Sequence, residues 1–259
     1  MPWGAFQCRV WPLPPHCVPA GPRFRVSPLD AGPVERSSIR MKVTYYLEVL
    51  SSWCHWVEPV WAELKSRYKG RAEFEWRIAL MRQEDFPVSL NQCEWFYRRS
   101  GGTMMHSPVM LNSGWFEEGR TDAFQNPSLV AEAAKDFGFT DDRIRLALSR
   151  AALVDGRKVG RIEEAVAVAA KASAVPARKL RARAESAAVK ARVAGSTAEF
   201  LSHRIGQRPA FVLEDAIGDK AVFSGLVTIE PLAATIDAML ADTAAYAAHA
   251  AHHGSTPAG

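Results

Sequence analysis

The residue with the clearest chemical potential is Cys54, which follows an alternating run of largely apolar residues at 43–50. The apolar residues Val57, Trp61 and Leu64 then recur at helical spacing, which predicts Cys54 at the first turn of a helix. Backbone N–H groups and the helix dipole at such a position favour a negative charge, and the thiolate is the reactive form of cysteine. The pattern therefore predicts a nucleophilic thiol, although a free cysteine is also often buried and inert.

The residues beside Cys54 have side chains that could act with it. A protonated His55 would stabilise a thiolate, or it would simply face solvent, and Trp53 and Trp56 would offer an aromatic surface to a substrate. Cys93 is the only other cysteine after the first forty residues. It is expected in the core, or else as a remote thiol that resolves a disulfide on Cys54. The cysteine spacings match no zinc pattern, so no metal site is expected.

The elements that must position these residues follow in the order β–α–β, a helical block, then β–β–α. Alternating and helical patterns predict strands at 43–50, 72–80, 209–214 and 220–224, with helices after Cys54 and at 228–240. The stretch between the second and third strands is predicted to be helical. Within it, Ser196-Thr-Ala-Glu199 has the spacing of a capping box at a helix start, and the basic stretch from Arg178 to Arg192 is expected to be a solvated surface.

The chain divides by composition into four parts. Residues 1–40 hold half of the sixteen prolines, without strand or helix periodicity, and are expected to be disordered. They would be an extension from an upstream start codon, a real tail or a targeting segment, and they contain no secretory signal pattern. Residues 41–87 and 204–242 are expected to form one domain, 88–203 an inserted α-helical domain, and 243–259 a disordered tail.

This order, together with the motif Ser52-Trp53-Cys54-His55-Trp56-Val57, resembles the DsbA family of thiol-disulfide oxidoreductases, including its cytosolic DsbA/FrnE-like branch. Residues 147–157 are similar to that branch's mid-domain helix. The segment Ile205 to Phe211 lies where the family has a conserved loop, so Pro209 would be a cis-proline facing the active cysteine. The resemblance spans about residues 42–241. It implies an α/β thioredoxin fold with an inserted helical domain, and a thiol or disulfide substrate.

Two departures from the family pattern matter for chemistry. The usual motif is C-x-x-C, and with Cys54 as its first cysteine the fourth position is Val57. A lone Cys54 could form mixed disulfides but could not pass on an intramolecular one. Arg208, which precedes Pro209, is larger than the family's usual residue and would lower the pKa of a nearby thiol or attract an anionic substrate.

Two other functions stay open beside single-cysteine exchange. The same superfamily contains hydroxychromene-carboxylate isomerases and kappa-class glutathione transferases, which place serine at the reactive position to stabilise bound glutathione. Ser51 and Ser52 come before Cys54 and do not quite match that position, and Ser224-Gly225 lacks the acidic partner that those enzymes use for glutathione. The third function is a non-catalytic binding module.

The composition of the 259 residues is that of a globular protein, with 48% hydrophobic and 23% charged residues. A net charge of +4 is too small to indicate nucleic acid, and no apolar run reaches membrane-spanning length. A cytoplasmic location is expected from the missing export signal. Glutathione is expected as a co-substrate at most, with no tightly bound cofactor, and the sequence gives no oligomeric state.

Overall fold

The computed structural model describes residues 41–105, Gly114, 116–117 and 124–254. The expected disorder of residues 1–40 and of the last five residues falls outside this range. The described residues belong to one contact unit, Ser38–Gly259.

A four-stranded sheet forms the centre of this unit. Its strands are β1 (Met41–Leu47), β2 (Ala72–Ile78), β3 (Ala210–Glu214) and β4 (Lys220–Ser224), in the order β2-β1-β3-β4. β1 pairs parallel with β2 and antiparallel with β3, and β3 forms an antiparallel hairpin with β4. β1 is buried on both faces, which explains why its sequence is almost continuously apolar.

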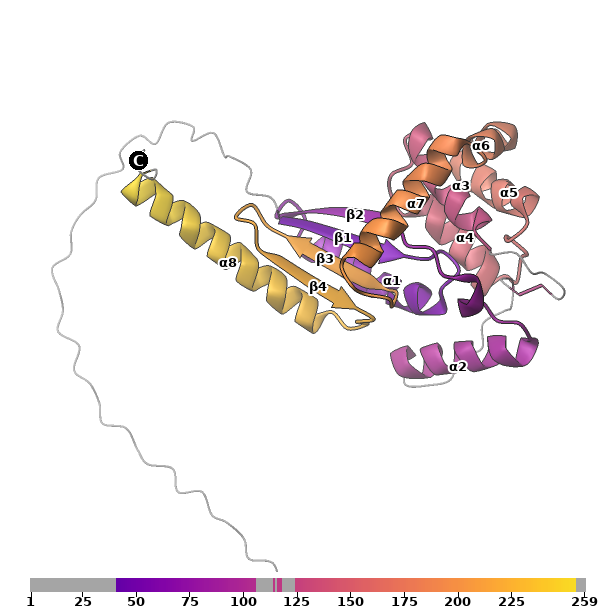
Figure 1. The fold of residues 1–259 in the computed structure, drawn as a ribbon, viewed down its shortest axis with the longest axis horizontal. Coiled ribbons are helices and arrows are strands. Elements are labelled where there is room, and N and C mark those ends of the chain that lie inside the picture. The colour runs from indigo at the N-terminus through magenta and orange to yellow at the C-terminus, as the bar shows by residue number, and fades with distance from the viewer. Residues whose placement is uncertain (1–40, 106–113, 115, 118–123, 255–259) are drawn as a thin grey trace, which may run out of the picture. The chain divides into compact units, whose positions relative to one another are not determined.

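The two faces of β1 meet different helices. On one face Tyr45 stacks on Phe211 and contacts Trp61 of α1 (Ser52–Arg67). On the other face Tyr46 packs against Phe200 of α7 (Ala187–Ser202). The final helix, α8 (Glu230–His253), joins the α1 side, because the Tyr68 hydroxyl after α1 donates to the carbonyl of Ala233. The expected β–α–β and β–β–α halves are both present (Figure 1).

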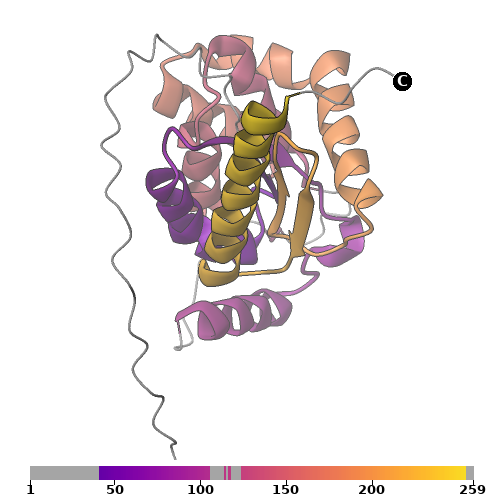
Figure 2. The same cartoon turned by 90° about the vertical axis from the view of Figure 1, so that its left-hand side faces the viewer.

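Most of the described residues between β2 and β3 are helical. The helices are η1 (Gln83–Asp85), α2 (Leu90–Met105), α3 (Asn126–Ala134), η2 (Lys135–Phe137), α4 (Arg143–Leu153), α5 (Ile162–Ser173), α6 (Ala177–Ala184) and α7. α3 to α6 pack on one another, whereas α2 lies against α1, separate from that group (Figures 1 and 2). The helical insertion therefore contacts the start of α1 from one side through α2.

The capping box expected at Ser196-Thr-Ala-Glu199 is wrong, because these residues lie inside α7. The helix begins ten residues earlier, where the Ser186 hydroxyl caps Val189 N–H. Ser196 instead donates to the carbonyl of Ile78 at 2.6 Å, and the Thr197 hydroxyl accepts from Leu80 N–H. The two hydroxyls cover the outer edge of β2, an edge that would otherwise expose unpaired backbone groups.

The expectations for the C-terminus are also wrong in part. The last helix does not end near residue 240, and the predicted disordered tail is helical as far as His253. Alanine has the highest helix propensity, so the alanine-rich sequence continues the helix although the residues after Thr243 are exposed. Within the described part of the chain, no helix is long and apolar enough to cross a membrane.

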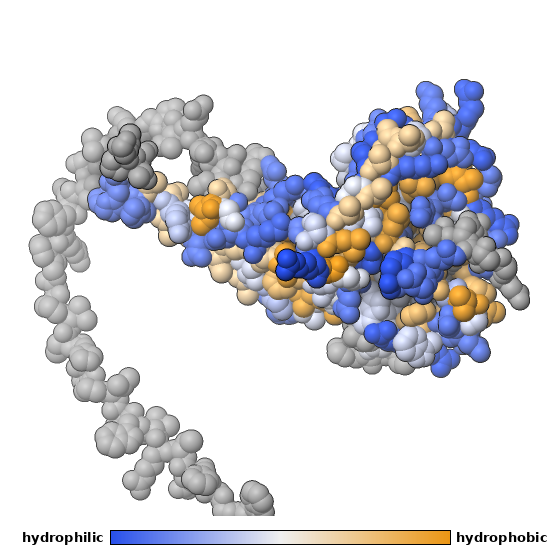
Figure 3. Space-filling model, viewed as in Figure 1, coloured by the Kyte–Doolittle hydropathy of each residue, from blue (hydrophilic) through white to orange (hydrophobic). Residues whose placement is uncertain are grey.

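The basic stretch in α6 and α7 forms a solvated surface, as expected. Arg181 pairs with Glu163 and Glu185, and Arg183 and Arg192 both pair with Asp136. On the face drawn in Figure 3, hydrophilic residues cover much of the helical insertion. The positive charge of this surface is thus largely matched by nearby carboxylates.

Candidate active site

The start of α1 is defined by Ser51. Its backbone is extended, and its hydroxyl accepts a hydrogen bond from Cys54 N–H at 3.3 Å, which makes it the N-cap residue. The first helical hydrogen bond runs from His55 N–H to the carbonyl of Ser51. The N–H groups of Ser52 and Trp53 have no partner within a helix at this end. The N-cap, and not Cys54, therefore stands where the helix dipole acts most strongly.

Cys54 points inward from the first turn and is only 2% exposed. Burial raises the pKa of its thiol to about 11, although hydrogen bonds from the Glu48 backbone and the Ser51 side chain lower it. This direction runs against the expected ionised Cys54, because removal from water outweighs the stabilisation by the helix start. Cys93 is likewise buried, as the core alternative for it expected.

The residues beside Cys54 do not assist a thiolate. Burial lowers the pKa of His55, as does the charge of Arg150, so the imidazole is neutral at neutral pH. Its Nδ1 lies 3.4 Å from the Ser149 hydroxyl of α4. This direction disfavours the imidazolium, one of the two alternatives expected for His55. Trp56 donates its indole N–H to the hydroxyl of Ser100 on α2, at 3.1 Å.

A pocket of about 410 Å³ opens at the start of α1, a volume typical of small-molecule sites. The residues that line it are Ser51, Ser52, Trp53, Met81, Glu84, Asp85, Phe96, Arg99, Gly206, Gln207, Arg208 and Gly225. Of the six site residues expected from the sequence, Trp53 and Arg208 line the pocket. Cys54, His55, Trp56 and Pro209 are not among its described lining residues.

The opposite wall of the pocket is the loop before β3. The Arg208–Pro209 peptide is cis, as expected. The Pro209 carbonyl accepts from Gly225 N–H at 2.8 Å, which ties this loop to the end of β4. The Arg208 guanidinium donates to the carbonyls of Ala79 and Leu80, beyond the end of β2. Burial lowers the pKa of Arg208, but a guanidinium stays charged in proteins, so the pocket has a fixed cation.

Three further charged residues, which the sequence pattern did not indicate, also belong to this site. Glu84 and Asp85 of η1 and Arg99 of α2 line the pocket beside Arg208. Arg99 lies over the rings of Trp53 and Trp95, at 5.8 and 5.3 Å from their centroids. No local pattern marks these residues, because they meet only when the insertion folds against α1.

Glu48, just after β1, was also missed. It is 1% exposed, and burial raises the pKa of its carboxyl. Its oxygens accept from the Ser128 hydroxyl at 2.7 Å and from Met81 N–H at 3.2 Å. A glutamate within an apolar strand run was the available signal, since buried carboxylates require partners.

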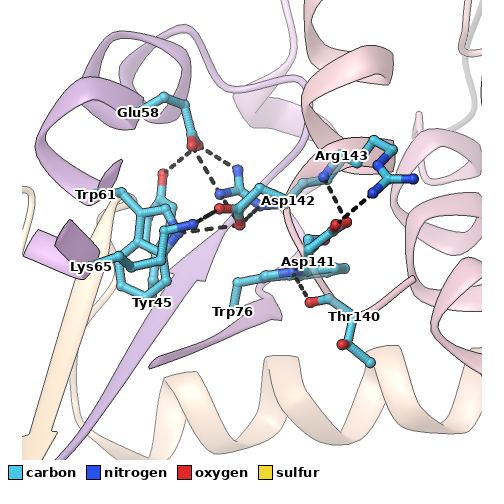
Figure 4. A network of polar contacts seen from close by, with 10 residues as sticks. Tyr45, Glu58, Trp61, Lys65, Trp76, Thr140, Asp141, Asp142 and Arg143 are labelled. Carbon is cyan, nitrogen blue, oxygen red and sulfur yellow. Dashed lines mark hydrogen bonds and ion pairs between the residues drawn. The ribbon is translucent and has the colours of Figure 1, made fainter. Parts of the chain in front are cut away.

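A polar network fixes α1 against α4 (Figure 4). Arg145 of α4 is buried and donates to both carboxylate oxygens of Glu58 on α1, at 2.5 and 2.9 Å. It also pairs with Asp142, which accepts in turn from Trp61 and Lys65 of α1. The network holds the helix whose first turn forms the pocket floor.

Comparison with known proteins finds similar solved structures but no similar sequence. No family model and no curated protein matches the sequence. A proposed protein disulfide isomerase from Nitrosomonas europaea superposes with a TM-score of 0.65 at 16% identity, covering 78% of this chain and 98% of its own. The cytosolic disulfide reductase DsbM from Pseudomonas aeruginosa superposes with a TM-score of 0.60 at 17% identity, covering 77% of this chain and 98% of its own. DsbA from the same organism superposes with a TM-score of 0.54 at 14% identity, covering 83% of this chain and 90% of its own.

The chain has a thioredoxin-like fold. It is the form found in DsbA-type oxidoreductases, with helices inserted between β2 and β3, the second and third strands along the chain. Within the thioredoxin-like fold, the C-x-x-C motif of the resembled family belongs at the first turn of the first helix. Counted from the N-cap, that spacing gives Ser51-Ser52-Trp53-Cys54. In this count Ser51 and Cys54 stand three residues apart, as the two cysteines of a C-x-x-C motif do.

Proposed function

We propose that this protein binds glutathione, or a similar small thiol peptide, and uses it as a co-substrate in a transfer or isomerisation reaction. The observation that carries the proposal is Ser51 at the N-cap of α1, beside the pocket, where an exchange enzyme would need a cysteine. With Cys54 buried and its pKa raised, the reactive sulfur is supplied by the ligand.

The charges around the pocket suit glutathione, which carries two carboxylates and one ammonium group. Arg99 and Arg208 supply positive charge for the carboxylates. Glu84 and Asp85, which also pair with Arg82, supply negative charge for the ammonium. The acidic partner that the sequence near Ser224-Gly225 lacks would come from η1 instead.

The proposed chemistry uses the helix start to lower the pKa of the bound thiol. Free backbone N–H groups and the serine hydroxyls stabilise the thiolate, and the thiol proton leaves to solvent. The thiolate then forms a bond to an electrophilic carbon of a second substrate. In an isomerisation the same bond breaks later and the thiolate is regenerated. Trp53 and Phe96, on the pocket wall, offer an apolar surface to that second substrate.

The comparisons support this assignment at the level of the fold. DsbM from Pseudomonas aeruginosa was also solved with glutathione, and that structure superposes with a TM-score of 0.59 at 17% identity. The cytoplasm, expected from the sequence, would supply glutathione in its reduced form.

Calorimetry with reduced glutathione tests the proposal. We expect binding by the unaltered protein, weaker binding by Ser51→Ala, and unchanged binding by Ser202→Ala, an exposed serine at the end of α7 that does not line the pocket. Absence of binding at millimolar glutathione would refute the proposal. Binding without turnover of any electrophile would favour the non-catalytic module.

Alkylation separates this function from thiol-disulfide exchange through Cys54. With a pKa of about 11, Cys54 should react with iodoacetamide only slowly at neutral pH, and much faster after unfolding in denaturant. Rapid modification of the folded protein at pH 7, lost in Cys54→Ala, would restore the single-cysteine mechanism.

A further inference from the structure

We infer that Ser100 of α2 is a positioning residue that orients the Ser52 hydroxyl as a hydrogen-bond donor toward the sulfur of the bound thiol. The inference rests on the proposed function and adds to it a second hydroxyl and a residue from the insertion. Ser52 lines the pocket, and Ser100 is fully buried behind it.

Three contacts meet at the Ser100 hydroxyl. The Trp56 indole N–H lies 3.1 Å from its oxygen, the Ser52 hydroxyl 3.0 Å, and the backbone carbonyl of Tyr97 3.3 Å. Trp56 and Ser52 belong to α1, whereas Ser100 and Tyr97 belong to α2. The Ser100 hydroxyl is therefore a junction between the two helices.

The chemistry of the groups limits how their protons are arranged. An indole N–H can only donate, so one lone pair of Ser100 is always occupied by Trp56. Ser100 has a single proton, which goes either to the Tyr97 carbonyl or to Ser52. In the first arrangement Ser52 donates to Ser100, and its proton points away from the pocket. In the second arrangement Ser52 accepts from Ser100, so its own proton is free.

An anionic sulfur in the pocket selects the second arrangement. A thiolate accepts but cannot donate, so it attracts the free Ser52 proton. The three donors then align from Trp56 through Ser100 to Ser52. Aligned hydrogen bonds polarise one another, most strongly where water is excluded. No covalent bond changes, and two hydroxyl rotations suffice. Ser51 is not part of this chain of donors, because its hydroxyl oxygen accepts from Cys54 N–H and makes no described contact with Ser100.

The consequence is a measurable shift in the acidity of the bound thiol. Loss of a hydrogen bond to a charged group is worth enough to change an ionisation equilibrium about tenfold. We expect Ser52→Ala and Ser100→Ala each to reduce the thiolate fraction of bound glutathione about tenfold at a pH below its pKa. The double variant should be no worse than Ser52→Ala, because Ser100 acts through Ser52.

The experiment is a pH titration of the ultraviolet absorbance of protein-bound glutathione thiolate, with affinity measured separately by calorimetry. Ser186→Ala, which removes the remote cap of α7, controls for a general loss of stability. Ser100→Thr keeps the hydroxyl and should retain the unaltered titration. The hydrogen bonds from Trp56 through Ser100 to Ser52 form a relay. If Ser100→Ala does not fold, Trp56→Phe removes the indole donor at the far end of this relay and should shift the titration in the same direction.

The outcomes distinguish the inference from the proposed function. If the unaltered protein does not bind glutathione, the proposed function and the inference about Ser100 are both refuted. If it binds, and the thiol titrates identically in Ser100→Ala or Trp56→Phe, the relay is refuted and the binding site stands. A shift that is equal in Ser186→Ala would also overturn the relay, since it would reflect stability alone. A shift in the relay variants only, with near-normal affinity, supports it.

Discussion

At the scale of single residues, the proposed function depends on one atom, the hydroxyl oxygen of Ser51. Ser51 caps the helix through its hydroxyl oxygen and lies next to Cys54. A cysteine at the same place would present sulfur to the same N–H group. Whether this chain performs exchange chemistry therefore depends on that oxygen, because the N-cap is where a thiol would be activated.

The first prediction restores the missing sulfur. In Ser51→Cys, the introduced thiol should have a lowered pKa, since it gains the helix dipole and the Cys54 N–H. Glutathione disulfide should oxidise it and Cys54 to an intramolecular disulfide, releasing two molecules of glutathione. The measurement is the redox equilibrium in glutathione buffers, followed by mass spectrometry, and reduction of a protein disulfide by the variant.

The matched control is Ser52→Cys, the same change one residue further along. Its spacing to Cys54 is one residue short, so we expect no rapid disulfide and no reductase activity. Equal behaviour of the two variants would contradict the assignment of Ser51 to the first position of the motif.

The second prediction concerns His55 and acid. Burial lowers the pKa of this imidazole, whereas the unfolded value is about 6.5. Below that pH the unfolded state binds more protons than the folded state, so stability is complete above about pH 6.5 and falls as the pH drops through the folded pKa. In denaturant titrations, His55→Gln should lose less stability than the unaltered protein between about pH 6.5 and 5.

The control is the exposed His249 on α8, whose replacement by glutamine should leave that pH dependence unchanged. Burial lowers the pKa of His203 as well, so some slope should persist in His55→Gln. An identical dependence of stability on pH in all three proteins would show that His55 does not cause it.

At the scale of elements, the pocket depends on how firmly α1 is held. Arg145 is 2% exposed and compensates the carboxylates of Glu58 and Asp142. Its removal leaves the Glu58 carboxylate without the cation that pairs with it, whereas Asp142 keeps its ion pair with Lys65. Breaking one side of a buried pair costs about 3–5 kcal/mol, whereas an exposed pair contributes about 0–1 kcal/mol.

The third prediction follows from this contrast. Arg145→Met should lower the free energy of unfolding by about 3–5 kcal/mol in urea titrations. Arg143→Met, which breaks the exposed pair with Asp141, should change it by less than about 1 kcal/mol. A similar small effect of both substitutions would mean that the network in Figure 4 does not anchor α1.

Periodicity predicted the type of each element better than its ends. The strands and α1 were placed correctly because their apolar faces repeat at characteristic spacings. The first turn of α1 was also placed correctly, because Cys54 lies in it. The pattern did not show that Ser51 is the N-cap, since Ser51, Ser52 and Cys54 are all acceptable near a helix start. A shift of three residues exchanges the N-cap for an inward-facing position. The same limit explains the wrong capping box at Ser196. This serine lies inside α7, and its hydroxyl contacts the edge of β2 instead of capping the helix.

At the scale of the whole molecule, the fold was predictable because its two halves have distinct patterns separated by a helical block. The positions of the charged residues in the pocket were not predictable from the sequence. Arg99 and Arg208 lie more than a hundred residues apart in sequence, and only the packing of α2 against α1 places both at one pocket. Long-range placement of this kind has no local signal, so the polar half of the site is visible only in three dimensions.

The last prediction concerns α8, whose C-terminal part continues past its buried contacts. Thr243 is 2% exposed and its hydroxyl bonds to the Asp215 carboxylate, whereas every described residue after it is exposed. Deletion of 245–259 should therefore leave Tm unchanged while reducing the helical circular dichroism signal. Deletion of 241–259 also removes Thr243 and should cost about 1–2 kcal/mol, or several degrees in Tm. A lower Tm in the shorter deletion would mean that the exposed helix end packs on another surface, such as a second copy of this chain, and sedimentation would then show the change in mass.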